Sequence, residues 1–455
     1  MLAAVVLCFF IGYLAIAFEH PLKLDKTVPA LLMGAICWSL IALGHLDVID
    51  NEGLVVSAHG AAGVDYTDGL LSVLLHHVGK IAEILLFLLG AMTIVELVDL
   101  HQGFSVITNR ITTNNKRQML VIVSVLAFFL SSVLDNLTTT IVMISLVRRL
   151  ISDQNDRLWF ASMIIIAANA GGAWTPIGDV TTTMLWIGKK ISTVEVMKNL
   201  FVPSIVCAFI PVLLIMLRKD FQGNFITPGL KEGETRAKQG LLSSHVMLAT
   251  GLGALIFVPI FKSVTHLPPY LGMMLGLGLT WLVSEYIHPE EDFSEERKHS
   301  YSARHALSRI ELSSILFFAG ILLTISALES IAVFQDGKIV GFLHQVAENL
   351  GAAVPNQNIV IILIGMLSAV VDNVPLVAAT MGMYPDPMDA QLWHFIAYSA
   401  GTGGSILIIG SAAGVAAMGL ERIDFIWYLK NIAWIAFLGF ITGAGIFIVW
   451  HALVN

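Results

Sequence analysis

The chain has 455 residues, of which 56% are hydrophobic and 13% charged, and its formal net charge at pH 7 is −8. Soluble domains carry about a quarter charged residues, so a chain this apolar lacks the polar groups to cover itself in water. The composition therefore excludes a soluble enzyme and a disordered scaffold, and the acidic balance excludes a basic surface for nucleic acid. We predict an all-α polytopic membrane protein whose apolar helices are about 20 residues long.

The predicted spanning helices begin with residues 2–18, which follow no basic segment and precede no small-residue cleavage site. We therefore expect a membrane helix there and not a removable signal peptide. The further apolar runs are 28–45, 75–98, 157–188, 199–217, 243–261, 269–287, 311–332, 391–420 and 428–451.

Two other apolar stretches, 118–150 and 357–384, are interrupted near the middle by a polar pair. The first pair is Asp135–Asn136 and the second is Asp372–Asn373. At about 1.5 Å per residue, each arm reaches roughly to the bilayer midplane and a little beyond. We predict that both stretches are re-entrant hairpins with the carboxylate at or near the tip.

The distribution of basic residues fixes the predicted orientation. Residues 46–74 contain no Lys or Arg and several Asp, so they are expected outside. With ten crossings, nineteen of the 25 basic residues then fall in the cytoplasm. We predict a multi-pass protein of the cell inner membrane with both termini in the periplasm. The six basic residues left outside are Lys80, Lys189, Lys190, Lys198, Lys262 and Lys338.

The sequence also contains an internal repeat. Residues 85–90 match 315–320, residues 131–136 match 368–373, and residues 171–179 match 403–411, at nearly one offset. Each copy has five crossings, an odd number, so the second copy is expected to be inverted, as is typical of secondary transporters. The predicted domains are a first repeat at 1–217, with hairpin 118–150 and broken helix 157–188; a cytoplasmic linker at 218–242; and a second repeat at 243–455, with hairpin 357–384 and broken helix 391–420.

The paired hairpin carboxylates are the first candidates for chemistry. A carboxylate at bilayer depth is costly unless it is paired, protonated or bound to an ion. Asp135 and Asp372 could each simply cap the following arm, since Asp is a good N-cap. Capping alone would not require an ionisable residue twice where Ser or Asn would serve, and we therefore predict a functional role for both.

Two glycine-rich stretches, Gly171–Thr183 and Gly401–Ser411, supply further candidates. Their glycines, with Pro176, disfavour a continuous helix, and non-helical backbone at this depth is tolerated where it lines a cavity. Freed carbonyls and the hydroxyls of Thr175, Thr181, Ser405 and Ser411 offer hard oxygen ligands for a small cation such as Na⁺. Asp179 is a third buried carboxylate, for which an ion or proton role and a structural hydrogen bond both remain open.

The Asp–Asn hairpins, the stretch Asn169–Asp179 and the two inverted halves resemble the NhaD-type Na⁺/H⁺ antiporters of the ion transporter superfamily. The resemblance implies a homodimer with scaffold and transport domains that works as an elevator. It maps hairpin tips 135–139 and 372–376 and stretches 171–182 and 403–412 onto the substrate site. The implied ion ligands are Asp135, Asn136, Thr138, Thr139, Thr175, Asp179, Thr182, Asp372, Asn373, Ser405 and Ser411.

We therefore predict exchange of Na⁺ or Li⁺ for H⁺, with no cofactor and no enzymatic activity. The second half replaces Thr138, Thr175 and Asp179 with Pro375, Leu407 and Ser411, so the two half-sites are not expected to bind equally. The alternatives are a Na⁺-coupled carboxylate transporter and an arsenite exporter. An intramembrane aspartyl protease is disfavoured, because its two Asp residues need no inverted repeat. The remaining intramembrane ionisable groups, including Glu96 and His394, are expected to be solvated or interfacial.

Overall fold

The computed structural model describes residues 1–50, 54–57, 66–108, 111, 113–225, 241–289, 299–335 and 338–454. Most of the predicted linker 218–242 lies outside these residues. Within them the chain is helical apart from two short antiparallel strand pairs, β1 (Val48–Ile49) with β2 (Val55–Val56) and β3 (Ala332–Gln335) with β4 (Lys338–Gly341). The predicted all-α polytopic membrane fold is confirmed.

Five helices among the described residues are long and apolar enough to cross a bilayer unaided. They are α4 (Tyr66–Leu100), α10 (Thr193–Met216), α11 (Ser244–Thr265), α15 (Leu312–Ser330) and α22 (Ala433–Val454). Further apolar helices are shorter, and α16 (Phe342–Ala353) meets α17 (Gln357–Leu367) at a bend of 114°. The predicted hairpins and broken helices are formed by helices outside this group of five, ranging from 8 residues in α9 (Val180–Ile187) to 20 residues in α8 (Gln154–Ala173).

The chain forms two compact units, and each draws on both halves of the sequence. The units are therefore a different division from the predicted repeats, whose boundaries stay a prediction. One unit comprises 1–86, 311–360 and 374–387, and the other comprises 87–310, 361–373 and 388–455. Helix α4 runs through the boundary between Leu86 and Phe87, and α17 runs through the one between Val360 and Ile361.

In the first unit, α3 (Thr27–Leu43) packs against α1 (Leu2–Ala17) and α15. Glycines at the α3–α15 crossing allow the backbones to approach closely, because a Cβ at Gly320 would lie 2.6 Å from the carbonyl carbon of Ala30. Trp38 adds a hydrogen bond across the crossing, from its indole Nε1 to the carbonyl oxygen of Leu323 at 2.9 Å. The unit also contains α2 (Glu19–Leu22), α16 and most of α18 (Asn373–Met383).

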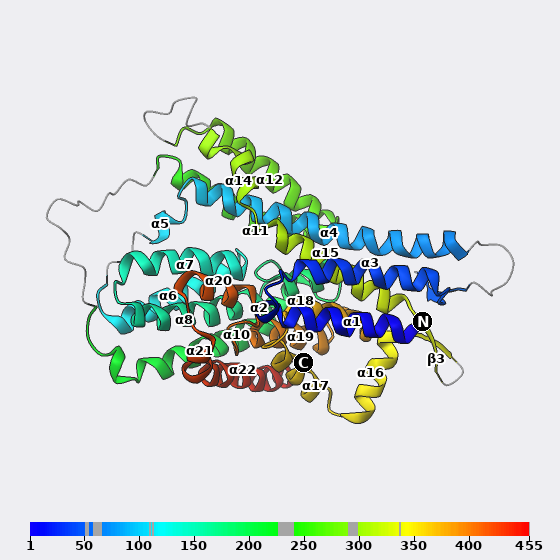
Figure 1. The fold of residues 1–455 in the computed structure, drawn as a ribbon. Coiled ribbons are helices and arrows are strands. Elements are labelled where there is room, and N and C mark those ends of the chain that lie inside the picture. Colours follow the sequence, from blue (N-terminus) through cyan, green and yellow to red (C-terminus); the bar gives the residue numbers. More distant parts are fainter. Residues whose placement is uncertain are drawn as a thin grey trace. The chain divides into compact units, whose positions relative to one another are not determined.

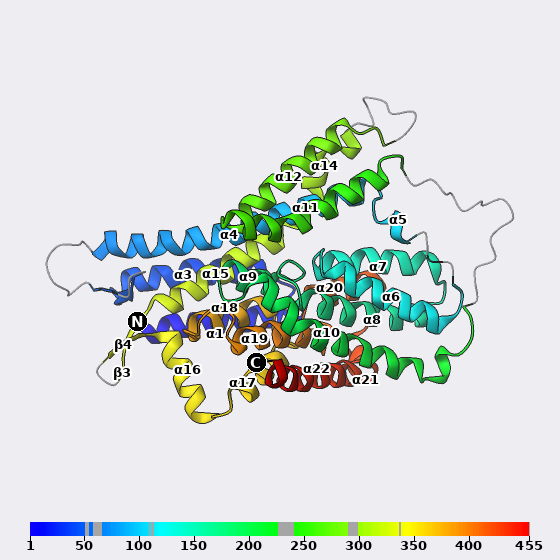
Figure 2. The same ribbon diagram turned by 180° about the vertical axis from the view of Figure 1, so that it is seen from behind.

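The second unit contains the first hairpin and both broken helices. Helices α6 (Lys116–Ser131) and α7 (Asn136–Leu150) lie beside α8 (Gln154–Ala173), and α20 (Ala412–Glu421) packs against α7 and α8 (Figure 1). Helix α10 lies along α22 and also contacts α8 (Figure 2). The remaining elements are α5 (Ser105–Thr108), α9 (Val180–Ile187), η1 (Lys219–Phe221), α12 (Pro269–Tyr286), η2 (His299–Tyr301), α14 (Ala303–Arg309), α19 (Gln391–Gly403) and α21 (Phe425–Asn431).

Helix α8 forms the centre of this second unit. Every residue from Phe160 to Ala173 is buried, whereas a helix on a protein surface buries a single face. Its N-terminus is capped by Asp153, whose carboxylate accepts a hydrogen bond from the backbone N–H of Asp156. The polar Asn169 is buried within this apolar run, so its amide must find partners inside the protein.

Candidate functional site

The first hairpin turns at Asp135, as predicted, between α6 and α7. The carboxylate of Asp135 caps α7: its Oδ1 accepts the backbone N–H of Thr138 at 2.7 Å, and its Oδ2 accepts the Thr138 hydroxyl at 2.7 Å. The capping role that the sequence left open is therefore present. Capping orients the carboxylate without burying it fully, and Asp135 remains partly exposed.

The first broken helix is interrupted between α8 and α9 at residues 174–179. The hairpin lies so close to this break that a Cβ at Gly171 would overlap the carbonyl oxygen of Phe128. The Thr175 hydroxyl donates to the Ser132 carbonyl at 2.6 Å, and the Ser131 hydroxyl donates to the Ala168 carbonyl at 2.6 Å. These contacts hold the hairpin tip against the broken helix.

The second half repeats this construction. A Cβ at Gly403 would overlap the carbonyl oxygen of Gly365, and the Ser368 hydroxyl donates to the Ala400 carbonyl at 2.9 Å. Gly403 and Ser368 are the counterparts of Gly171 and Ser131 in the sequence repeat. The same packing contact and the same hydrogen bond therefore recur at matching positions in both halves.

Asn169 joins the two halves at the centre of the second unit. Its Oδ1 accepts a hydrogen bond from the Asn136 amide at 2.8 Å. Its Nδ2 donates to the hydroxyls of Ser405 and Ser411, each at 2.9 Å. The side chain thus links the first hairpin to the second broken helix.

Asp179 lies in the same network and is 2% exposed. Its Oδ1 accepts a hydrogen bond from the Asn136 amide at 3.2 Å, and its Oδ2 accepts one from the Thr181 hydroxyl. Asp372, at the second hairpin, is near enough to interact with it electrostatically. Asp179 begins α9 but makes no capping hydrogen bond, so its carboxylate is directed to these side chains.

Several buried polar atoms in this part of the unit have no hydrogen-bond partner among the described residues. They are the hydroxyl oxygens of Thr139 and Thr182 and the amide nitrogen of Asn373. Buried polar groups without partners are rare and call for an explanation. The described residues contain no group of three or more His, Cys, Asp or Glu side chains able to hold a metal ion. An ion bound here would rely on hydroxyl, amide and carbonyl oxygens as well as carboxylates.

Six of the eleven predicted ligands fall into two hydrogen-bonded sets. One set is directly hydrogen-bonded and consists of Asn136, Asp179, Ser405 and Ser411, linked in part through Asn169. Asp135 and Thr138 bond to each other, and Asp135 interacts electrostatically with Glu96 on α4. The Ser411 hydroxyl also caps α20 by accepting a hydrogen bond from the backbone N–H of Gly414. Ser411 is the counterpart of Asp179 in the sequence repeat, and it offers a neutral acceptor at that position.

Three further residues were not among the predicted ligands although the sequence contained a signal for each. Asn169 begins the stretch on which the family resemblance rests and which ends at Asp179, and Ser131 and Ser368 begin the two matching hairpin segments. Their side chains make the contacts that assemble the network. These three residues do not stand out in the sequence, because their side chains are neutral and they lie within a regular helix or at its end.

One expectation about an intramembrane group was wrong. His394 was expected to be solvated or interfacial, but its side chain is 1% exposed and lies 3.4 Å from the carboxylate of Asp389. Asp389 also accepts the backbone N–H of Ser192 at 2.6 Å. His394 is therefore a buried part of the contact between the start of α19 and the start of α10.

Comparison with known proteins agrees with this arrangement. A protein-family model described as a citrate transporter matches residues 13–403. Sodium/proton antiporter 1 of Arabidopsis thaliana is 44% identical over 99% of this chain and 73% of its own length. The Na(+)/H(+) antiporter NhaD of Vibrio cholerae is 31% identical over 99% of this chain and 91% of its own. The solved YdaH transporter of Alcanivorax borkumensis has the same fold, with a TM-score of 0.58 at 14% identity over 94% of this chain and 98% of that one.

The fold, the paired hairpins and these matches define a multi-pass membrane transporter of the citrate transporter family, and not an enzyme. Within that class, the chain belongs to the NhaD-type antiporters.

Proposed function

We propose that the protein exchanges Na⁺ for H⁺ across the membrane at the site around Asp179. The observation that carries this proposal is a buried carboxylate in the same compact unit as buried hydroxyls that have no hydrogen-bond partner among the described residues. Asp179 is 2% exposed, and the Thr139 and Thr182 hydroxyls lie unpartnered in the same unit. A buried negative charge is costly, and a cation coordinated by oxygen ligands offsets that cost. The named antiporter relatives support the same reaction.

Exchange follows if the two ions compete for the same carboxylates. A buried carboxylate is stabilised either by a bound cation or by its own proton, and the carboxylate must be deprotonated to bind a metal ion. One site that holds Na⁺ or H⁺, and carries either to the other side, couples their movements in opposite directions. We expect the Na⁺ concentration for half-maximal exchange to rise as the pH falls, because protons then occupy more of the sites.

A proteoliposome experiment tests this proposal. Purified protein is reconstituted with a pH-sensitive dye inside the vesicles, and Na⁺, Li⁺, K⁺, citrate or arsenite is added outside. We expect proton movement after Na⁺ or Li⁺ and none after the other solutes. Asp179→Asn, Asp135→Asn and Asp372→Asn are each expected to reduce the Na⁺ response by at least about 100-fold, because each removes a negative charge that the bound ion neutralises. Normal exchange in Asp179→Asn would refute the assignment.

The citrate and arsenite arms test the alternatives that the sequence left open. The matched family model is described as a citrate transporter. The hairpin tips 135–139 and 372–376 and the stretches 171–182 and 403–412 contain no Lys or Arg to neutralise an anion. Carboxylate transport is therefore the weaker proposal, and Na⁺-dependent citrate uptake that requires Asp179 would replace ours.

The finer features of transport remain part of the proposal. The two broken helices and the repeated hairpin contacts favour alternating access, and we propose that it proceeds by an elevator movement in a homodimer. The bias of basic residues supports placement in the inner membrane with periplasmic termini. Li⁺ is proposed as an alternative transported ion, and no cofactor is proposed.

A further inference from the structure

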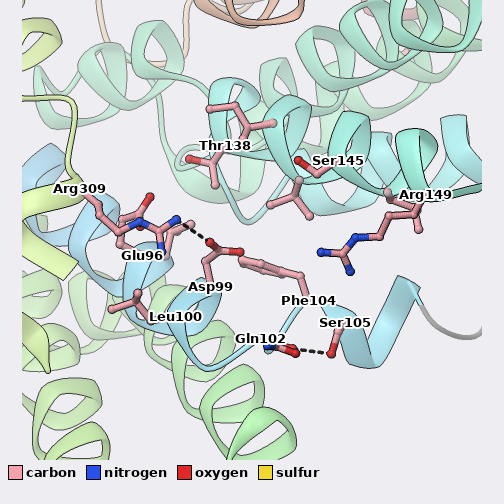
Figure 3. Close-up of a pocket in the computed structure, with 14 residues that line it drawn as sticks. Glu96, Asp99, Leu100, Gln102, Phe104, Ser105, Thr138, Ser145, Arg149 and Arg309 are labelled. Carbon is pink, nitrogen blue, oxygen red and sulfur yellow. Dashed lines mark hydrogen bonds and ion pairs between the residues drawn. The ribbon is translucent and has the colours of Figure 1, made fainter. Parts of the chain in front are cut away.

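The second unit contains a charged chamber next to Asp135. Its volume is about 580 Å³, and α4, α7 and the end of α14 all contribute to its lining. Figure 3 shows Glu96 and Asp99 on α4 facing Arg309, with Thr138, Ser145 and Arg149 on the opposite wall. Asp99 and Arg309 are 42% and 41% exposed, so the chamber reaches the surface at this end.

The two acids in the chamber are held differently by Arg309. Asp99 accepts a hydrogen bond from Nη2 of Arg309 at 3.0 Å. The buried Oε2 of Glu96 lies 3.2 Å from Nε of Arg309, an ion-pair distance, but it makes no hydrogen bond with Arg309 or with any other described residue. Arg309 therefore attracts Glu96 without satisfying its carboxylate oxygen, which leaves Glu96 able to accept another cation.

Glu96 also connects the chamber to the proposed ion site. It interacts electrostatically with Asp135, and Thr138, which lines the chamber, donates its hydroxyl to Asp135 at 2.7 Å. A path of polar groups therefore leads from the exposed Asp99 past Glu96 to Thr138 and Asp135. Clefts lined by charge on low-dielectric walls raise the local concentration of the opposite ion.

We propose that this chamber is the aqueous entrance through which a hydrated monovalent cation reaches Asp135, and that Glu96 receives the cation on the way. The inference rests on the proposed function and adds a second carboxylate to it. In the absence of the cation, Arg309 forms an ion pair with Glu96, and the entering cation takes the place of Arg309 beside the Glu96 carboxylate.

The first test measures water access with charged thiol reagents. Cys8, Cys37 and Cys207 are replaced by Ala, and a single cysteine is introduced as Ser145→Cys in the chamber wall or as Thr442→Cys on the exposed face of α22. We expect a cationic methanethiosulfonate to modify Ser145→Cys about tenfold faster than Thr442→Cys, and faster than an anionic reagent does. Modified Ser145→Cys should lose most of the Na⁺-driven exchange that it shows untreated.

The second test keeps the native cysteines and uses kinetics. Glu96→Gln is expected to raise the Na⁺ concentration for half-maximal exchange by about tenfold with little change in the maximal rate. The matched variant Asp220→Asn, whose carboxylate accepts a hydrogen bond from Arg218 and does not line the chamber, is expected to shift it by less than about twofold. A residue with only a structural role would not produce this split between affinity and rate.

Three results would overturn the proposed entrance: equal modification of the two cysteines, faster reaction with the anionic reagent, or equal Na⁺ affinities in Glu96→Gln and Asp220→Asn. Failure of the proposed function gives a different pattern. The parent protein would then show no Na⁺-driven proton movement, while the modification rates would still report whether water and cations enter the chamber.

Discussion

Asn169 shows how much of the site depends on one neutral side chain. Its amide uses both ends, accepting from Asn136 and donating to Ser405 and Ser411. Asn is suited to this position because the amide offers both a carbonyl acceptor and two N–H donors. A carboxylate there would add charge and lose the donors, and a serine would have too few donors for two hydroxyls.

We predict that Asn169→Ala impairs both stability and exchange. Three hydrogen bonds are lost and their partners are left buried, at a cost of about 2–3 kcal/mol in the free energy of unfolding. Na⁺ affinity should fall as well, because Asn136 and Ser411 lose their common partner. Ser162→Ala on the same helix is the control, since the Ser162 hydroxyl bonds only to the Leu158 carbonyl one turn away. Thermal unfolding in detergent and proteoliposome exchange measure the two effects, and equal behaviour of the two variants would contradict the role of Asn169.

At the residue scale, sequence reasoning could identify charged groups and could not identify their neutral partners. Asp135 and Asp179 are conspicuous in an apolar chain because their burial is costly. Whether Asn169 reaches Ser405, 236 positions later, depends on how the two halves pack. That contact has no local signature. His394 was misjudged for the same reason, since its burial comes from the packing around it and not from its neighbours in sequence.

At the scale of elements, the structure is dominated by hairpin tips pressed against broken helices. Glycine is needed at the contact because the carbonyl oxygen of the hairpin occupies the space that a Cβ would fill, at Gly171 and again at Gly403. The same close approach in both halves explains why the glycine pattern was visible as a sequence repeat.

We predict that Gly171→Ala lowers the thermal unfolding temperature and the exchange rate together. The added methyl forces the α6 backbone away from α8, and overpacking of this kind costs about 1–3 kcal/mol. Gly278→Ala on α12 is the matched control, because a Cβ there would meet no atom within 4 Å. If the two substitutions shift the unfolding temperature equally, the close contact does not matter for stability.

The positions of most helices could be predicted from apolar runs, including the turns at Asp135 and Asp372 and the breaks after Gly171 and Gly403. The amphipathic α16 and the β3–β4 pair were not predicted, since neither is apolar enough to resemble a membrane span. The partition of the chain into two compact units was also beyond the sequence, because each unit combines segments from both repeats.

At the scale of the whole second unit, an ion-pair triad centred on a buried carboxylate joins the two halves of the chain. The Glu421 side chain at the end of α20 is 1% exposed and accepts from Arg148 Nε at 2.6 Å and from Arg157 Nε at 3.0 Å. Arg148 belongs to α7 and Arg157 to α8, so one carboxylate ties the second broken helix to the first hairpin and the first broken helix.

We predict that Glu421→Gln is strongly destabilising. Hydrogen bonds to charged groups are worth about 1.5–3 kcal/mol each, and Glu421→Gln weakens two of them, one from Arg148 and one from Arg157. Arg148→Gln should cost less, since Arg148 is the more exposed partner and Arg157 still neutralises Glu421. The unfolding temperatures of the two variants in detergent provide the comparison. The triad is not essential if Glu421→Gln unfolds at the temperature of the parent protein.

Asp179 in the first half of the chain is matched by Ser411 in the second half, so the two halves differ chemically at equivalent positions. Both copies keep the turn that brings a side chain to the centre, but one copy presents a full charge and the other only a dipole. In the proposed exchange cycle, an ion at Asp179 therefore contacts an ionisable group, whereas an ion at Ser411 contacts a neutral hydroxyl. Two halves with matching backbone contacts thus offer two chemically different environments.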